Sequence, residues 1–132
     1  MGVLLHDYIN GNCYIQLFDD GTKIREWDDK AFPLFPDSLD LKLTNYCDAG
    51  CAFCHEESTK RGKHGKLDYV MGFLNDLPSG CEIAIGGGNP LSHPDLDKIL
   101  FFMRGKGLIA NITVNSFHIK SSLKRLNFFR EE

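Results

Sequence analysis

The first third of the chain alternates β-prone residues in a way that predicts a hairpin. Residues 13–18 and 22–27 are rich in β-branched and aromatic side chains, and Asp20-Gly21 lies between them. Asp-Gly between two such runs is a strong signal for a tight antiparallel turn. Two prolines in residues 28–37 favour a connector over a further element. We therefore expect residues 1–37 to form an N-terminal β-hairpin and connector.

From residue 38 onward, short apolar runs alternate with segments whose apolar residues recur at helical spacing. This alternation is typical of an α/β fold with a parallel sheet, and it defines a second expected unit over residues 38–132. We expect strands at 38–44, 81–85 and 108–114, and helices at 67–77, at 96–103 and from about residue 121, the last one carrying Leu123, Leu126 and Phe129.

Composition narrows the class of protein without naming a function. The net charge is −3, so no broad basic field indicates a nucleic-acid partner, and no apolar stretch is long enough to cross a membrane. The first residues become polar too early for a secretory signal. We therefore expect a cytoplasmic protein, whose reducing surroundings keep its five cysteines as thiols.

Three of those cysteines form the most specific motif in the sequence. Cys47, Cys51 and Cys54 follow the first predicted strand with the spacing C-x₃-C-x₂-C. Thiolates this close together are typical of a metal centre, and three ligands around a four-iron cubane leave one iron open for chemistry. A structural zinc site is the alternative, because His64 could supply a fourth ligand to one tetrahedral ion. A disulfide framework is disfavoured by the odd cysteine count.

The ends of the next two predicted strands carry polar or glycine-rich loops. Gly86-Gly87-Gly88-Asn89-Pro90 follows the second strand, and Asn115-Ser116-Phe117 follows the third. Ligands of open parallel sheets gather at the carboxyl ends of the strands. We therefore expect both loops to lie beside the cysteine loop. His55 and His93 are more simply explained as polar loop residues than as ligands.

Together these motifs resemble the radical SAM superfamily of iron–sulfur enzymes. The cysteine motif, with Phe53 just before its third cysteine, resembles the signature of that family. The glycine run resembles the family's Gly-Gly-Glu-Pro motif, and Thr113-Val114-Asn115-Ser116 is similar to its Thr-Asn-Gly strand end. The resemblance covers about residues 38–120.

The resemblance implies a cofactor and a reaction. Cys47, Cys51 and Cys54 would hold a [4Fe-4S] cluster, and S-adenosyl-L-methionine would bind its open iron. An electron from a flavodoxin- or ferredoxin-like donor would cleave that cofactor to a 5′-deoxyadenosyl radical, which abstracts hydrogen from a substrate that the sequence does not identify.

The family pattern also implies neighbours for S-adenosylmethionine. Phe53 would lie against the adenine, and Gly86, Gly87 and Gly88 would let the backbone approach the methionine part, where side chains would block it. Asn115 and Ser116 are further candidates. Gly88 or Asn89 stands where the family has an acidic residue, depending on which glycine pair is aligned.

The resemblance further implies a fold and an incomplete site. The family core is a partial TIM-like (β/α) barrel of six βα units, and this sequence has about three. We therefore expect part of such a barrel, preceded by the hairpin, with a second chain or a further segment completing it. A cluster-binding remnant without activity, or a zinc-binding module that is not an enzyme, are the alternatives.

Overall fold

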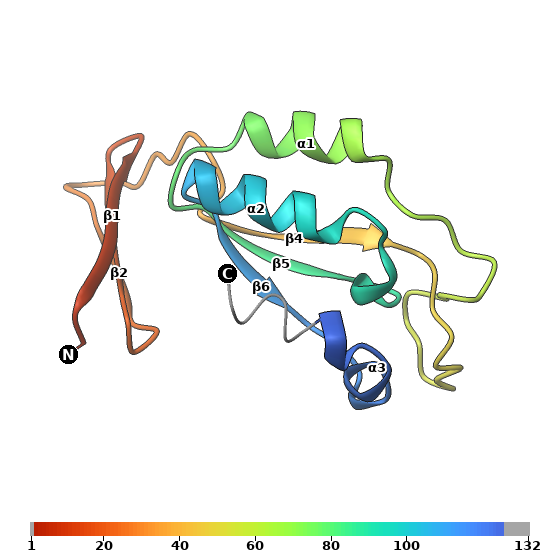
Figure 1. Cartoon of the computed structure of the whole chain (residues 1–132). Coiled ribbons are helices and arrows are strands. Elements are labelled where there is room, and N and C mark those ends of the chain that lie inside the picture. The colour runs from red at the N-terminus through yellow and green to blue at the C-terminus, as the bar shows by residue number, and fades with distance from the viewer. Residues whose placement is uncertain (1, 126–132) are drawn as a thin grey trace.

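The computed structural model describes residues 2–125, which form two separate three-stranded sheets (Figure 1). The first sheet is antiparallel and consists of β1 (Leu4–Asn10), β2 (Cys13–Phe18) and β3 (Lys23–Glu26). The hairpin of β2 and β3 lies where the sequence predicts it. Strand β1 was missed, because its apolar residues stay largely exposed and so give no clear alternation.

The second sheet is parallel, in the order β4-β5-β6, with strands β4 (Ser38–Thr44), β5 (Glu82–Gly87) and β6 (Ile109–Ile112). Helices α1 (Leu67–Asn75) and α2 (Leu96–Lys106) lie side by side over one face of this sheet (Figure 1). A 3₁₀ turn, η1 (Pro90–Ser92), leads into α2, and α3 (Ser116–Ser121) follows β6.

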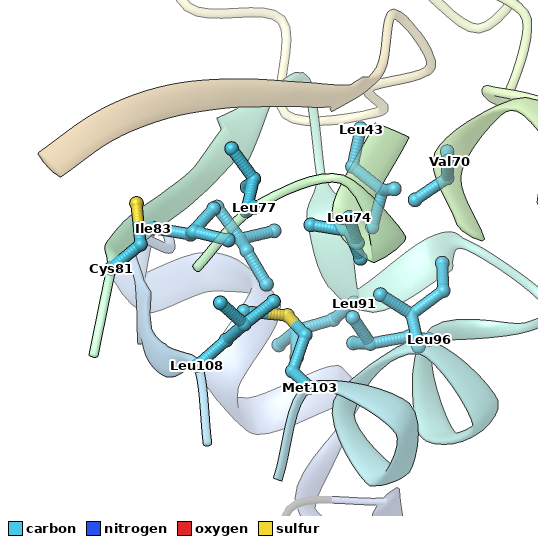
Figure 2. Close-up of a cluster of buried hydrophobic side chains, with 12 residues drawn as sticks. Leu43, Val70, Leu74, Leu77, Cys81, Ile83, Leu91, Leu96, Met103 and Leu108 are labelled. Carbon is cyan, nitrogen blue, oxygen red and sulfur yellow. The ribbon is translucent and has the colours of Figure 1, made fainter. Parts of the chain in front are cut away.

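The hydrophobic core fills the space between this sheet and the two helices (Figure 2). Strands contribute alternate residues and helices contribute residues spaced three or four apart, as burial on one face of each element requires. The fully buried members are Leu43, Leu74, Cys81, Ile83, Ile85, Leu96, Ile99 and Met103.

The expected partial TIM-like barrel is wrong. The described residues form two small sheets with few helices, and neither sheet closes or repeats in the TIM-like way. The β4-β5-β6 face opposite α1 and α2 carries exposed Asp40, Lys42 and Asn111, so it is a solvated face. A strand–helix alternation predicts parallel pairing, but closure depends on strand number and stagger, which the alternation does not encode.

The third helix also departs from expectation. The sequence predicts a helix from about residue 121, whereas α3 begins at Ser116. Asn115 explains the earlier start, because its side-chain Oδ1 accepts a hydrogen bond from the Phe117 N–H at 2.9 Å and so caps the helix. Residues 123–125 are helical again, and Leu126 and Phe129 lie outside the described residues.

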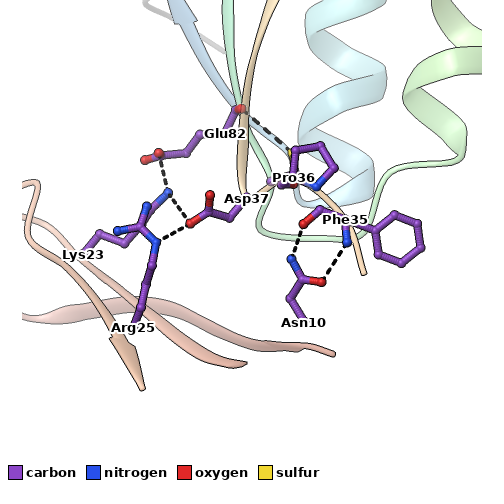
Figure 3. A network of polar contacts seen from close by, with 8 residues as sticks. Asn10, Lys23, Arg25, Phe35, Pro36, Asp37 and Glu82 are labelled. Carbon is purple, nitrogen blue, oxygen red and sulfur yellow. Dashed lines mark hydrogen bonds and ion pairs between the residues drawn. The ribbon is translucent and has the colours of Figure 1, made fainter. Parts of the chain in front are cut away.

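A polar network joins the antiparallel sheet to the amino ends of the parallel strands (Figure 3). Lys23 on β3 contacts Glu82 at the start of β5, and Arg25 contacts Asp37 just before β4, each at 2.5 Å. Asn10 is buried and both accepts from and donates to the Phe35 backbone. The N-terminal sheet is therefore fixed at the end of the parallel sheet farther from the cysteine loop (Figure 1).

None of the helices in the described part of the chain has both the length and the apolar character that a membrane span requires.

Asp37 gives this junction a pH dependence. Burial raises the pKa of its carboxyl, but the hydrogen bond and charge of Arg25 and the charge of Lys23 outweigh burial and lower the pKa below its ordinary value. A carboxyl with a lowered native pKa stabilises the fold above its unfolded pKa, and this stabilisation is lost as the pH falls through the native pKa. We expect Asp37→Asn to lower the free energy of unfolding at pH 7 by about 1 kcal/mol.

Chemical denaturation of both proteins between pH 7 and pH 3 measures this difference. The difference in free energy of unfolding between the unaltered chain and Asp37→Asn should become smaller as the pH falls through the native pKa of Asp37. Asp28→Asn is the matched control, since Asp28 is an exposed carboxylate in the same connector, and it should change stability by less than about 0.5 kcal/mol. A pH-independent gap for Asp37→Asn would contradict the assignment.

Candidate metal centre

The carboxyl ends of the three parallel strands bring the predicted loops together. The cysteine loop follows β4, the glycine run follows β5, and the Asn115 turn follows β6. The Asn89 N–H donates to the Tyr46 carbonyl at 2.7 Å, and the Asn115 Nδ2 donates to the Cys51 sulfur at 3.4 Å. All three loops therefore belong to one site.

Residues 59–65 fold back along the end of β4 and fix the base of the cysteine loop. The Asn45 N–H donates to the Lys63 carbonyl at 2.9 Å, and the Cys47 N–H donates to the Thr59 carbonyl at 3.0 Å. The Thr44 hydroxyl oxygen lies 2.7 Å from His64 Nδ1 and accepts from the Tyr46 N–H. The loop therefore leaves the sheet in a defined direction, although Cys51 itself is exposed.

The glycine run lies against the root of the same loop. The Gly88 N–H donates to the Thr44 carbonyl at 2.7 Å. A Cβ on Gly88 would lie 2.1 Å from the Tyr46 carbonyl oxygen, and one on Gly87, whose φ is +113°, would lie 2.2 Å from the Thr44 carbonyl oxygen. Gly86 differs, since a Cβ there would meet nothing within 4 Å. Two glycines thus permit strand-end contact, and the third leaves open space.

All five cysteines are free thiols, and the three of the motif are partly or fully exposed. Backbone N–H groups of Ser58 and Glu56 lower the pKa of the Cys54 thiol. The Asn115 amide donates to the Cys51 sulfur. Donors aimed at sulfur stabilise a thiolate, which is the form that binds metal.

The structure adds two ligand candidates that the sequence analysis did not name. His118 Nε2 lies 2.9 Å from Asp48 Oδ1 and 3.9 Å from the Cys47 sulfur. Among the described residues, these three side chains form the one group of three whose donor atoms all lie within 4.8 Å of one another. The three thiols of the motif do not form such a group. That is compatible with a cubane, in which each cysteine binds a different iron.

His64 and His93 have other partners. His64 contacts Thr44, and burial together with the neighbouring charge of His93 lowers its pKa. His93 is buried, with Nε2 at 2.7 Å from the Gly65 carbonyl and Nδ1 accepting from the Asp95 N–H. The zinc alternative required His64 to lie close to the three motif cysteines. Within residues 2–125, His64 does not form a group with them in which all donor atoms lie within 4.8 Å of one another.

The remaining predicted residues differ in their surroundings. Phe53 is 96% exposed, so its ring is free to contact a ligand. The Asn89 side chain is buried, and its Oδ1 caps η1 by accepting from the Leu91 N–H at 3.1 Å. Ser116 is exposed at the start of α3. Among the predicted cofactor neighbours, Asn89 and Asn115 thus both have side chains that cap a helical turn.

A signal for His118 was present in the sequence. His118 lies three residues after Asn115, a strand-end residue that was predicted, and one helical turn returns a side chain to the same face. The predicted helix began at about residue 121, so it left His118 in the preceding loop, whereas α3 begins at Ser116. Asp48 carried no such signal, because an aspartate in a polar loop is usually a solvated residue.

No protein-family model, curated protein or solved structure matches this chain.

The glycine contact predicts a steric effect at one position and not at its neighbour. In Gly88→Ala the new methyl group would meet the Tyr46 carbonyl, so the end of β5 must move away from the cysteine loop. Overpacking of this kind costs about 1–3 kcal/mol, and we expect that loss in the free energy of unfolding. Urea denaturation of the apo-protein measures it.

Gly86→Ala is the control, because its methyl group enters open space. We expect a change below about 0.5 kcal/mol there. Equal losses for the two variants would mean that position 88 is no more crowded than position 86, which would contradict the predicted clash with the Tyr46 carbonyl.

Proposed function

We propose that this chain is a radical SAM iron–sulfur protein, with Cys47, Cys51 and Cys54 as the ligands of a [4Fe-4S] cluster. The observation that carries the proposal is the contact between the cysteine loop and the glycine run at the ends of adjacent parallel strands. A cluster held by the first motif and a cofactor held by the second would have to lie side by side, and this contact meets that requirement.

The donor set fits such a cluster. Iron–sulfur clusters are held by thiolates, and the three motif cysteines are free and accessible. Local N–H groups favour the thiolate of Cys54, and the Asn115 amide donates to the Cys51 sulfur. Hydrogen bonds to cluster sulfurs are one means by which proteins tune reduction potential.

The glycine run leaves room for S-adenosylmethionine beside the cysteines. Gly86 lies on the uncovered face of the sheet next to Lys42, and the space at its Cβ position is empty of protein atoms within 4 Å. Backbone carbonyls and N–H groups at a strand end can bind a zwitterionic amino acid without side chains. Phe53 offers an exposed aromatic face for an adenine ring.

When bound, the cluster and S-adenosylmethionine supply one-electron cleavage of a sulfonium and hydrogen abstraction from a substrate. The chain's own residues contribute thiolates, hydrogen bonds to sulfur and the space beside Gly86. We propose a flavodoxin- or ferredoxin-like electron donor and a cytoplasmic location, since free thiols and a cluster of this kind both require reducing surroundings.

Cluster assembly is the direct test. After anaerobic reconstitution, we expect about four irons and four sulfides per chain, measured by metal and sulfide analysis with absorption and electron paramagnetic resonance spectra. Cys51→Ser should lose the cluster because one iron loses its thiolate. Cys13→Ala should retain it, since Cys13 is buried in the N-terminal sheet. A full cluster in Cys51→Ser would refute the ligand assignment.

The space at Gly86 predicts a variant that impairs cofactor binding but not cluster assembly. A Gly86→Val side chain would enter the open space at the strand end without displacing described atoms within 4 Å of the Cβ position. We expect this variant to keep the iron and sulfide content and to weaken S-adenosylmethionine binding at least tenfold. The measurement is the spectral change of the reduced cluster on titration with S-adenosylmethionine.

Undiminished binding in Gly86→Val would exclude this space as the cofactor site and leave the cluster assignment intact. Gly105→Ala is the matched control, because Gly105 lies on α2 and a Cβ there also meets nothing within 4 Å.

A further inference from the structure

We propose that Cys47, Asp48 and His118 form a mononuclear site for a divalent transition-metal ion such as Zn²⁺, which shares Cys47 with the cluster and is therefore exclusive with it. The inference rests on the arrangement of these three side chains and does not require the cluster. It differs from a structural zinc site that is formed by all three motif cysteines and His64.

The donor set suits such an ion. A thiolate, an imidazole nitrogen and a carboxylate oxygen are the three ligand types that zinc prefers in proteins. The cysteine and aspartate are neighbours in the loop after β4, and His118 comes from α3, which follows β6. An ion bound here would therefore link the loop that follows β4 to the helix that follows β6, and β4 and β6 are the two edge strands of the parallel sheet.

The distances are close to those of a loaded site. Zinc–sulfur, zinc–nitrogen and zinc–oxygen bonds in tetrahedral geometry place sulfur about 3.5 Å from nitrogen and nitrogen about 3.3 Å from oxygen. The corresponding distances here are 3.9 Å for Cys47 Sγ to His118 Nε2 and 2.9 Å for His118 Nε2 to Asp48 Oδ1. Shifts of a few tenths of an ångström would give His118 Nε2 the spacing of a zinc ligand to both partners, and the Cys47 sulfur and the Asp48 carboxylate lie within 4.8 Å of each other.

Burial holds the histidine ring in place for this role. His118 is 1% exposed, and its Nδ1 is buried without a hydrogen-bond partner among the described residues. The backbone N–H of His118 donates to the Asn115 carbonyl at 2.9 Å, and this hydrogen bond fixes the first turn of α3. Nε2 is thus the ring nitrogen directed at Cys47 and Asp48, and it would be the metal-binding atom.

The fourth coordination position is open in this arrangement. Three protein ligands with a partly exposed carboxylate correspond to zinc sites that keep one position for water or another small ligand. A single ion and the cluster both need the Cys47 thiolate, so occupation by one excludes the other. Zinc bound here would therefore hold the protein in a form that cannot accept the cluster.

Cobalt titration tests the site. Co²⁺ alone is added to cluster-free protein under anaerobic conditions, and we expect about one ion per chain with a thiolate-to-cobalt charge-transfer band and the visible bands of tetrahedral geometry. Asp48→Asn and His118→Ala should each weaken binding more than tenfold. Circular dichroism checks that both variants are folded. If His118→Ala does not fold, Asp48→Asn by itself still tests the site.

Cys54→Ser is the discriminating control. Cys54 lies outside the three-residue group, so this variant should bind Co²⁺ as the unaltered chain does, whereas it should fail to assemble the cluster. Loss of Co²⁺ binding in Cys54→Ser would overturn the proposal in favour of an all-cysteine site. Unchanged binding in Asp48→Asn would overturn it as well.

Cluster assembly by the unaltered chain is scored separately, so failure of the cobalt site and failure of the proposed function are told apart.

Discussion

The close approach of the β5 strand end to the β4 strand end is the contact on which the candidate site depends. Hydrogen bonds from the Gly88 and Asn89 N–H groups to the Thr44 and Tyr46 carbonyls extend the parallel pairing beyond the regular strands. Side chains at positions 87 and 88 would collide with those carbonyls. Glycine at these two positions lets the backbone just before Cys47 contact the loop after β5 directly. The cysteine loop is therefore held at its base, although Cys51 is exposed.

The two ends of the parallel sheet serve different purposes. At the amino ends, Lys23, Arg25, Asp37 and Glu82 join the sheet to the antiparallel unit through charged contacts (Figure 3). At the carboxyl ends, loops with free thiols, an exposed aromatic ring and a buried histidine face one another. The candidate site lies at the carboxyl ends because the strands are parallel: all three strands end on the same side of the sheet, and the loops that follow them begin on that side.

Cys47 belongs to both of the metal centres that we propose. As one of three spaced thiolates it suits an iron–sulfur cluster, and as the neighbour of Asp48 and His118 it suits a single ion. Cys51 and Cys54 lie outside the second group. The loop can thus present the same thiolate to either centre, and the availability of iron, sulfide and zinc would decide which one forms.

The sequence by itself predicted strands at 38–44 and 81–85 and the two helices that cover them, close to the observed β4, β5, α1 and α2, because local apolar spacing and residue type carry that information. It also identified the residue types of the strand-end loops. Only the tertiary structure decided that the parallel sheet stays open with three strands, that β1 joins the hairpin, and that His118 lies against Cys47. Sheet closure depends on how many strands pair and with what stagger. The His118 contact joins residues 71 positions apart, so it depends on the packing of whole elements, which no local pattern records.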